Sequence, residues 1–125
     1  MRTIIAGSRT INSYDVVAQA VKNSGFEITE VVCGKARGVD YQGKLFAHRH
    51  NLPIKYFIAN WAMWGRAAGP KRNEKMAEYA EALIAVWDGF SHGTEHMIKV
   101  AEKLGLRVFV VKHDAVVSSR EGVKI

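Results

Sequence analysis

The sequence has few of the features that mark special classes of protein. A single cysteine, Cys33, excludes an intramolecular disulfide and fits a reducing compartment, so we expect a cytoplasmic protein. No apolar run approaches the roughly 20 residues that cross a bilayer, and we expect no membrane partner. The short apolar run after Arg2 ends at Gly7, which is typical of a strand rather than of a signal peptide.

The chain also contains no internal repeat, no low-complexity segment and no stretch that resembles a linker. We therefore expect one domain over residues 1–125, with a core at 2–111 and a tail at 112–125. Hydrophobic residues make up 48% and charged residues 24% of the 125 positions, which is ordinary for a globular protein. The net charge of +6 favours an anionic ligand or a polyanionic partner, although the basic residues form no continuous tract.

Apolar runs alternate with helical patterns along the whole chain. The expected strands are Thr3–Ala6, Ile28–Cys33, Ile54–Ile58, Ala82–Trp87 and Leu106–Val111. The expected helices begin at Asn12 or Ser13, after Asp40, at Pro70 and at Thr94, and they end at Ser24–Gly25, about His50, about Ala80 and Leu104. Their inward residues are Val16, Val17, Ala20 and Val21, then Leu45 and Phe46, then Met97, Ile98, Ala101 and Leu104. Val116 and Val117 could add a short edge strand, or the tail could be loose or dock on a partner.

This order predicts an α/β fold: a Rossmann-like three-layer sandwich with a mainly parallel five-stranded sheet and helices on both faces. Ligands of such sheets bind beyond the carboxyl ends of the strands. Three of these ends carry glycine-rich turns, at residues 7–9, 34–38 and 89–94, and we expect the turns to converge.

The turn between the fourth strand and the fourth long helix is the strongest candidate for an anion site. Gly89, Gly93 and Thr94 let backbone N–H groups approach a ligand, and the helix directs its positive end at the same place. We interpret this turn as holding a phosphate or another anionic part of a nucleotide.

Two further turns could contribute. Gly7, Ser8 and Arg9 offer a flexible backbone, a hydroxyl and a guanidinium, but could equally form a plain strand-to-helix turn. The segment from Gly34 to Asp40 is neither a Walker loop nor the usual dinucleotide fingerprint. In it, Arg37 could contact a phosphate, and Asp40 could contact a ribose hydroxyl or merely cap the helix.

The segment from Trp61 to Asn73 has no clean period. Trp61 and Trp64 could stack on a base or anchor a loop by packing. Arg72 could bind phosphate, although a cation at a helix start opposes the helix dipole.

His92 and His96 are four residues apart, which can place two metal ligands on one helix face. We expect His92 to precede the helix, and no third ligand is evident, so we predict neither a metal nor a resident cofactor. Cys33, at a strand end, is expected to lie in the core.

These segments together resemble the SLOG superfamily of Rossmann-like nucleotide-binding proteins, and most closely its YspA/YpsA-like branch of small stand-alone domains. The motifs occur in the family's order and cover about residues 2 to 111: Ile4–Arg9, Gly34–Asp40, Trp61 with Gly65–Asn73, and Gly89–Thr94. The resemblance implies a ligand site at the motif loops. The superfamily includes the Lonely Guy phosphoribohydrolases, the DNA-processing protein A family and predicted sensors of nucleotide signals, so the fold does not choose among functions.

One departure from the family pattern bears on chemistry. The Lonely Guy enzymes carry Gly-Gly-x-Gly-Thr-x-x-Glu, whose final Glu is catalytic, and Met97 stands at that position here. Glu95 lies two residues earlier, and two helical residues turn a side chain by about 200 degrees, so Glu95 cannot simply substitute. Asp40, Asp88 or Glu95 could supply a carboxylate at the ribose, but no catalytic residue is assigned.

Three functions follow from these patterns. The first is binding of a nucleotide or nucleotide-derived signalling molecule, as a sensor or sequestering module. The second is N-glycosidic hydrolysis of a nucleotide, and the third is binding of single-stranded nucleic acid. A homo-oligomer is expected by analogy with SLOG relatives. The predicted ligand-binding residues are Gly7, Ser8, Arg9, Gly34, Arg37, Asp40, Trp61, Trp64, Arg72, Asn73, Gly89, Gly93, Thr94 and Glu95.

Overall fold

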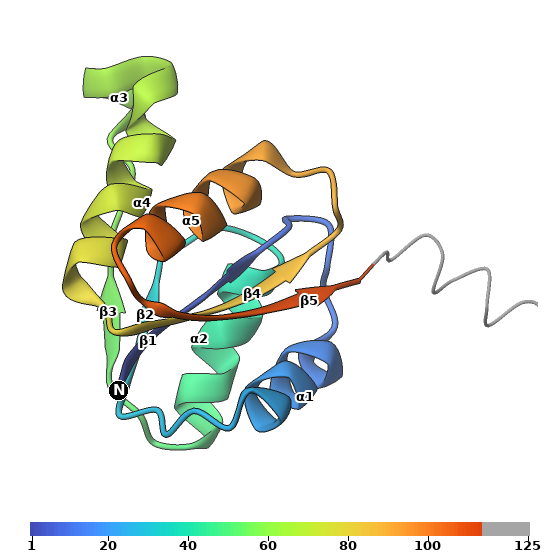
Figure 1. Cartoon of the computed structure of the whole chain (residues 1–125). Coiled ribbons are helices and arrows are strands. Elements are labelled where there is room, and N and C mark those ends of the chain that lie inside the picture. Colours follow the sequence, from blue (N-terminus) through green and yellow to red (C-terminus); the bar gives the residue numbers. More distant parts are fainter. Residues whose placement is uncertain (114–125) are drawn as a thin grey trace, which may run out of the picture.

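The computed structural model describes residues 1–113, which form one parallel sheet and its covering helices (Figure 1). The elements in chain order are β1 (Arg2–Gly7), α1 (Tyr14–Ser24), β2 (Glu30–Cys33), α2 (Val39–Arg49), β3 (Ile54–Tyr56), α3 (Trp61–Trp64), the 3₁₀ turn η1 (Gly65–Ala67), α4 (Ala68–Tyr79), β4 (Ala82–Trp87), α5 (His92–Lys103) and β5 (Arg107–Lys112). The predicted edge strand at Val116 and Val117 lies outside the described residues.

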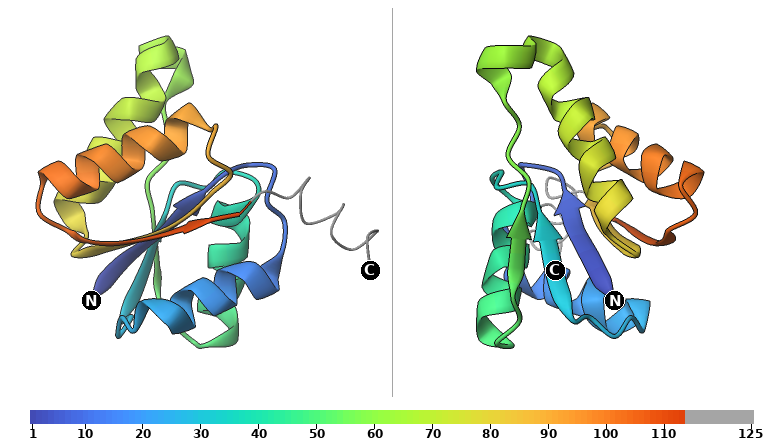
Figure 2. Two further views of the ribbon diagram at one scale, coloured as in Figure 1. Left: turned by 45° about the vertical axis from the view of Figure 1, so that its right-hand side comes forward. Right: turned by 90° about the vertical axis from the view of Figure 1, so that its left-hand side faces the viewer.

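The five strands are all parallel and lie in the order β3-β2-β1-β4-β5. Helices α1 and α2 cover one face, and α4 and α5 cover the other (Figure 2). The predicted Rossmann-like three-layer sandwich is therefore confirmed.

The central strands read as continuous apolar runs because both of their faces are buried. Ile5 packs in the core under α1 and α2, whereas its neighbour Ile4 packs in the core under α4 and α5, and neither side chain is exposed. Leu83 and Ile84 on β4 divide between the two cores in the same way. Each such side chain contributes about 1.5–3 kcal/mol by burial, which holds the sheet and so the strand ends in place.

The strand order reverses between β1 and β4. The chain builds outward from β1 to β2 and β3, then returns to add β4 on the other side of β1. The loops after β1 and β4 therefore diverge, and a crevice opens at the carboxyl ends of these strands, where such sheets bind ligands.

Side-chain caps define two of the helices that start at this edge. The Ser13 hydroxyl accepts a hydrogen bond from the Val16 N–H at 3.3 Å, which selects Ser13 over Asn12 as the cap of α1. At α5 the cap is Ser91, so the prediction that His92 precedes the helix is wrong: His92 is its first residue.

Three further expectations needed correction. Leu104 was expected to face inward, but it is 49% exposed because α5 ends at Lys103 and Leu104 serves as its cap. The third strand ends at Tyr56 and not at Ile58, since it pairs only with the four-residue β2. Leu45 is only half-buried, and α2 packs in the core through Val39, Phe46 and Ala47.

The aperiodic segment after β3 forms α3 and η1, which stand beyond the carboxyl ends of the strands (Figure 2). The Asn60 side chain caps α3 by accepting the Met63 N–H at 3.0 Å. Trp61, Met63 and Trp64 are all exposed there.

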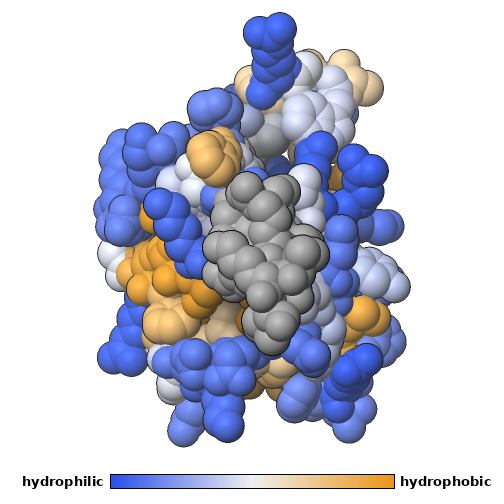
Figure 3. All heavy atoms as spheres, turned by 90° about the vertical axis from the view of Figure 1, so that its right-hand side faces the viewer, coloured by the Kyte–Doolittle hydropathy of each residue, from blue (hydrophilic) through white to orange (hydrophobic). Residues whose placement is uncertain are grey.

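Hydrophilic residues dominate the face of the molecule seen in Figure 3, and hydrophobic residues gather there only in separate patches. None of the helices within residues 1–113 is both long enough and apolar enough to cross a membrane.

Candidate functional site

The three predicted glycine-rich turns meet at Ser8. The Ser8 N–H donates to the Val86 carbonyl at 3.1 Å, and the Ser8 hydroxyl accepts the Asp88 N–H at 3.0 Å. The Ser8 carbonyl accepts the Val39 N–H at the start of α2, at 3.3 Å. One buried residue thus ties the end of β1 to the end of β4 and to the start of α2.

Two glycines make this close approach possible. A Cβ on Gly7 would lie 2.0 Å from the Val86 carbonyl oxygen, and one on Gly38 would lie 2.4 Å from the Ser8 carbonyl oxygen. Gly38 also has a φ of +71°, which side chains rarely adopt. Both positions therefore require glycine for the turns to converge.

The start of α5 is held by its own turn. The Asp88 carboxylate accepts the N–H groups of Phe90 and Ser91, each at 2.8 Å, and the Trp87 indole donates to the Ser91 carbonyl at 3.0 Å. Although burial alone would raise the pKa of Asp88, these hydrogen bonds bring it below the ordinary 3.8. The charged carboxylate therefore fixes the turn that presents the positive end of α5.

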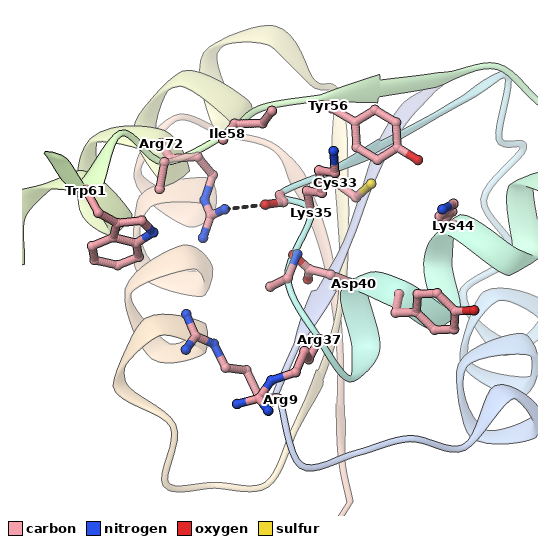
Figure 4. Close-up of a pocket in the computed structure, with 14 residues that line it drawn as sticks. Arg9, Cys33, Lys35, Arg37, Asp40, Lys44, Tyr56, Ile58, Trp61 and Arg72 are labelled. Atoms are coloured by element: carbon pink, nitrogen blue, oxygen red, sulfur yellow. Dashed lines mark hydrogen bonds between the residues drawn. The ribbon is translucent and has the colours of Figure 1, made fainter. Parts of the chain in front are cut away.

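Arg72 is the central cation of the site. Its Nη1 donates to the Gly34 carbonyl at 2.7 Å (Figure 4), and its Nε donates to the Asn73 side-chain oxygen at 3.2 Å. A Cβ on Gly34 would lie 2.3 Å from Nη1, so the glycine leaves room for the guanidinium. Helix α4 is thereby bound to the loop after β2.

Asp40 lies beside Arg72 and is buried. Its Oδ2 accepts the Ala36 N–H at 3.3 Å. Burial raises the pKa of Asp40 above the ordinary 3.8, while Arg72, the backbone N–H groups of Ala36 and Gly34, and Arg9 act in the opposite direction. The carboxyl group is therefore more easily protonated than an exposed aspartate.

Cys33 lies in the core, as predicted, with 1% of its surface exposed. Burial, with the nearby charge of Asp40, raises the pKa of its thiol from 9.0 to about 11. The thiol is therefore protonated near neutral pH, which does not suit a nucleophile.

Asn73 links α4 to α5. Its side-chain nitrogen lies 3.3 Å from the Gly93 carbonyl and 3.2 Å from Nδ1 of His96. When Asn73 donates to Nδ1, the neutral imidazole carries its proton on Nε2. This contact fixes the His96 ring at the edge of the crevice.

Two adjoining cavities open at this end of the sheet. The larger has a volume of about 630 Å³ and is called here the α5 cavity. It is lined by Asn73 from α4 and by an apolar floor of Ala6, Met76 and Met97. The start of α5 completes its lining with His92, Gly93, Thr94 and His96. The smaller, of about 470 Å³, is called the α2 cavity. It is lined by Arg37, Tyr41 and Lys44 from α2 and the loop before it, by Gly34 and Lys35, by Tyr56 at the end of β3 and by Ile58 after it (Figure 4). The two share Arg9, Ala36, Asp40, Trp61 and Arg72.

Most of the predicted ligand-binding residues line these cavities. They are Gly7, Arg9, Gly34, Arg37, Asp40, Trp61, Arg72, Asn73, Gly93 and Thr94. They come from the end of β1 and the turns after β1 and β2, from the starts of α2 and α5, and from α3 and α4, and only the fold brings them together.

The other four predicted residues, within the part of the chain that the structure describes, do not line either cavity. Ser8 is buried and ties the turns together, and Gly89 serves the backbone of its turn at a φ of +89°. Trp64 lies under the Lys71 ammonium, 4.2 Å from its ring centroid, and Glu95 pairs with Lys99 at 3.9 Å.

Met97 is buried and lines the α5 cavity. It places a thioether at the position where the resemblance to the Lonely Guy enzymes would have a catalytic Glu. Since Glu95 is turned to Lys99, the acids that face the cavities are Asp40 and Asp88.

Three residues of the α2 cavity, Tyr41, Lys44 and Tyr56, did not emerge from the sequence. Lys44 lies one helical turn after Asp40, and this spacing places the two on one face of α2. That signal could have identified Lys44. Tyr56 carries no local signal, because it belongs to β3 and reaches the cavity only through the sheet.

Over the described range 1–113, no three or more His, Cys, Asp or Glu side chains cluster in a way that could hold a metal ion. His92 and His96 both line the α5 cavity, and His96 contacts Asn73 there.

No protein-family model matches the sequence, and no curated protein matches it significantly. The fold is similar to that of DNA processing protein A (DprA) from Streptococcus pneumoniae, with a TM-score of 0.72 and 15% sequence identity. The likeness covers 92% of this chain and 51% of the other, so the chain spans about half the length of that protein. This chain and DprA thus share a Rossmann-like fold.

Proposed function

We propose that this chain binds a nucleotide or a nucleotide-derived signalling molecule at the paired cavities, as a sensor or sequestering module. The observation that carries the proposal is Arg72, held at the junction of the two cavities beside Arg9 and the buried Asp40. A guanidinium fixed by two hydrogen bonds is already ordered for a phosphate, so little side-chain entropy is lost on binding.

The surroundings of Arg72 fit the parts of a nucleotide. Gly93 and Thr94 at the start of α5 face the α5 cavity, where a helix N-terminus favours a phosphate. Trp61 lines both cavities and offers a ring for stacking on a base. Asp40 accepts hydrogen bonds, as a ribose hydroxyl requires.

Isothermal titration calorimetry against mono-, di- and cyclic nucleotides and ADP-ribose derivatives tests the proposal. We expect binding by at least one class, and a loss of about tenfold or more in Arg72→Ala, because a charge-assisted hydrogen bond contributes about 1.5–3 kcal/mol. Arg66→Ala, which removes an exposed arginine of η1, is the matched control and should bind normally. The absence of binding by every class at millimolar concentration would contradict the proposal. Mass spectrometry of small molecules released from the denatured protein gives an independent readout.

A second candidate is N-glycosidic hydrolysis of a nucleotide, supported by Asp40. Its carboxyl lines both cavities and has a raised pKa, as a general acid needs. Release of free base from nucleoside monophosphates, and its loss in Asp40→Asn, is the readout. A nucleotide that binds but is not hydrolysed would contradict this second candidate and would support binding alone.

A third candidate is binding of single-stranded nucleic acid. It is supported by the fold likeness to a protein named for DNA processing, by the net charge of +6 and by the exposed Trp61 and Trp64. Such binding would weaken steeply with salt. Labelled oligonucleotides that fail to shift at low salt would exclude it.

A further inference from the structure

The α2 cavity carries more positive charge than one phosphate requires. Five cations line it, and Asp40 is the carboxylate among its lining residues. The five cations are Arg9, Lys35, Arg37, Lys44 and Arg72. They come from the turn after β1, the loop after β2, and helices α2 and α4, and Figure 4 shows them arranged around Asp40.

Within residues 1–113, Asp40 is the carboxylate that lines this cavity and attracts Arg72 and Arg9, and the five cations exceed its single charge. Among residues 1–113 the ion pairs are Arg2 with Glu81 and Lys99 with Glu95, and neither reaches the cavity. Like charges gathered in one concave site repel one another and concentrate a field that attracts anions.

The α5 cavity is different. Its floor is apolar, formed by Ala6, Met76 and Met97, and the cations that line it are Arg9 and Arg72, which it shares with the α2 cavity. One phosphate at the start of α5 would use the shared arginines, and Lys35, Arg37 and Lys44 would remain without an anion.

The backbone supports a built site at the α2 cavity. Lys35 has a φ of +56°, a strained conformation for a residue with a side chain, and such strain persists where the surroundings impose it. The Lys35 ammonium lies 5.9 Å from the Tyr56 ring centroid, and the Lys44 ammonium lies 5.9 Å from the Tyr41 ring centroid. The cavity thus combines cations with aromatic walls.

We propose that the α2 cavity holds a second phosphoryl group, so that the preferred ligand is a nucleotide with at least two phosphoryl groups. One group lies at the start of α5 and the other among Lys35, Arg37 and Lys44, with Arg72 between them. The inference rests on the proposed nucleotide binding and names the class of nucleotide.

Matched pairs of ligands test this inference by calorimetry. Each nucleoside 5′-monophosphate is compared with the 5′-diphosphate and the 3′,5′-bisphosphate of the same base. We expect one of the two-phosphoryl ligands to bind about tenfold more tightly than its monophosphate, since a charged hydrogen bond adds about 1.5–3 kcal/mol. Equal affinities within every pair would overturn this inference and leave the proposed function intact, whereas no binding by any ligand would overturn both.

Lys44→Met supplies the variant, because methionine keeps an apolar chain of similar length and removes the charge. We expect Lys44→Met to lower the affinity for the two-phosphoryl ligand about tenfold and to leave the affinity for the monophosphate nearly unchanged. Lys22→Met, in the last turn of α1, removes one exposed lysine away from the cavities and should change neither. An equal loss for both ligand types in Lys44→Met would contradict a separate second phosphoryl site.

The melting temperature of the unliganded protein gives a second readout. Relief of repulsion should make Lys44→Met melt higher than wild type, whereas Lys22→Met should not. A lower melting temperature for Lys44→Met than for Lys22→Met would indicate a structural lysine and would contradict the inference.

Discussion

The amino and carboxyl ends of the parallel strands differ in the partners of their charged groups. At the amino end, the Glu81 carboxylate accepts the Arg2 N–H at 2.9 Å and pairs with its guanidinium at 3.8 Å, and the guanidinium donates to the Tyr79 carbonyl at 2.8 Å. The Met1 ammonium donates to the Glu27 carbonyl at 2.7 Å. At the carboxyl end, Arg9, Arg37 and Lys44 instead face a cavity, and no ion pair in the described part of the chain includes them.

Under the proposed function, this difference separates charges that stabilise the fold from charges that would bind the ligand. A paired charge at the amino end helps to hold neighbouring elements together. A group of unpaired cations reduces stability and is retained where it binds something. The comparison can be tested by substitutions at the two ends.

The largest effect is expected for Arg72→Lys, which keeps the charge and removes the planar fork. One ammonium cannot hold both the Gly34 carbonyl and the Asn73 side chain in the same geometry. We expect nucleotide affinity to fall about tenfold or more and the free energy of unfolding to fall by about 1–3 kcal/mol.

Calorimetry and urea denaturation measure these two quantities. Arg2→Lys at the amino end is the control, and it should leave affinity unchanged. Comparable losses of affinity in both variants would remove the distinction between the two ends.

Ser8→Ala tests a carboxyl-end residue that supports the site without lining it. The N–H of the half-buried Asp88 would lose its acceptor, at a cost of about 1 kcal/mol in the free energy of unfolding. We expect nucleotide affinity to change less than about threefold, well under the effect of one charged hydrogen bond. A large loss of affinity with unchanged stability would show that Ser8 contacts the ligand.

Carboxylates at the two ends should respond to pH in opposite ways. The Arg2 N–H and guanidinium hold the pKa of Glu81 below the ordinary 4.5. The ionised Glu81 therefore stabilises the fold above pH 4.5, and this stabilisation is lost as the pH falls through the pKa of Glu81 in the folded state. Burial raises the pKa of Asp40 above 3.8, so this group favours the fold fully below pH 3.8, and that contribution is lost as the pH rises through its folded pKa.

At pH 7 we therefore expect Glu81→Gln to be less stable than wild type and Asp40→Asn to be more stable. The Asp40→Asn difference should shrink as the pH falls from 7 toward 3.8, whereas the Glu81→Gln difference should shrink only below pH 4.5. Denaturant titrations at several pH values measure both differences. A loss of stability in Asp40→Asn at pH 7 would show that its attraction to Arg72 outweighs its burial.

The smallest effect is expected for Trp64→Ala. Trp64 is 48% exposed and contacts Lys71 outside both cavities, so stability should change by no more than about 0.5 kcal/mol and affinity should not change. Trp61→Ala removes a wall of both cavities and should weaken binding. Equal losses of affinity in Trp61→Ala and Trp64→Ala would contradict the assignment of ligand binding to the cavities, because only Trp61 lines them.

Much of the fold could be predicted because its signals are local. A parallel strand buried on both faces requires a continuous apolar run, as at Ala82–Trp87, and a tight turn requires glycine, as at Gly38. Errors arose at element ends, where packing decides. Leu104 has the spacing of an inward residue, but the helix ends one residue before it.

The sequence by itself determined the alternation of strands and helices, and therefore a sheet whose glycine-rich turns share one edge. It also identified Arg72 and Asp40 as separate candidates. Only the tertiary structure decided that Arg72 and Asp40 lie together at the junction of two cavities, and that Lys44 and Tyr56 complete the second. The physical reason is that side chains from α2, β3 and α4 become neighbours only after the sheet sets the positions of the elements, and no short stretch of sequence encodes that distance.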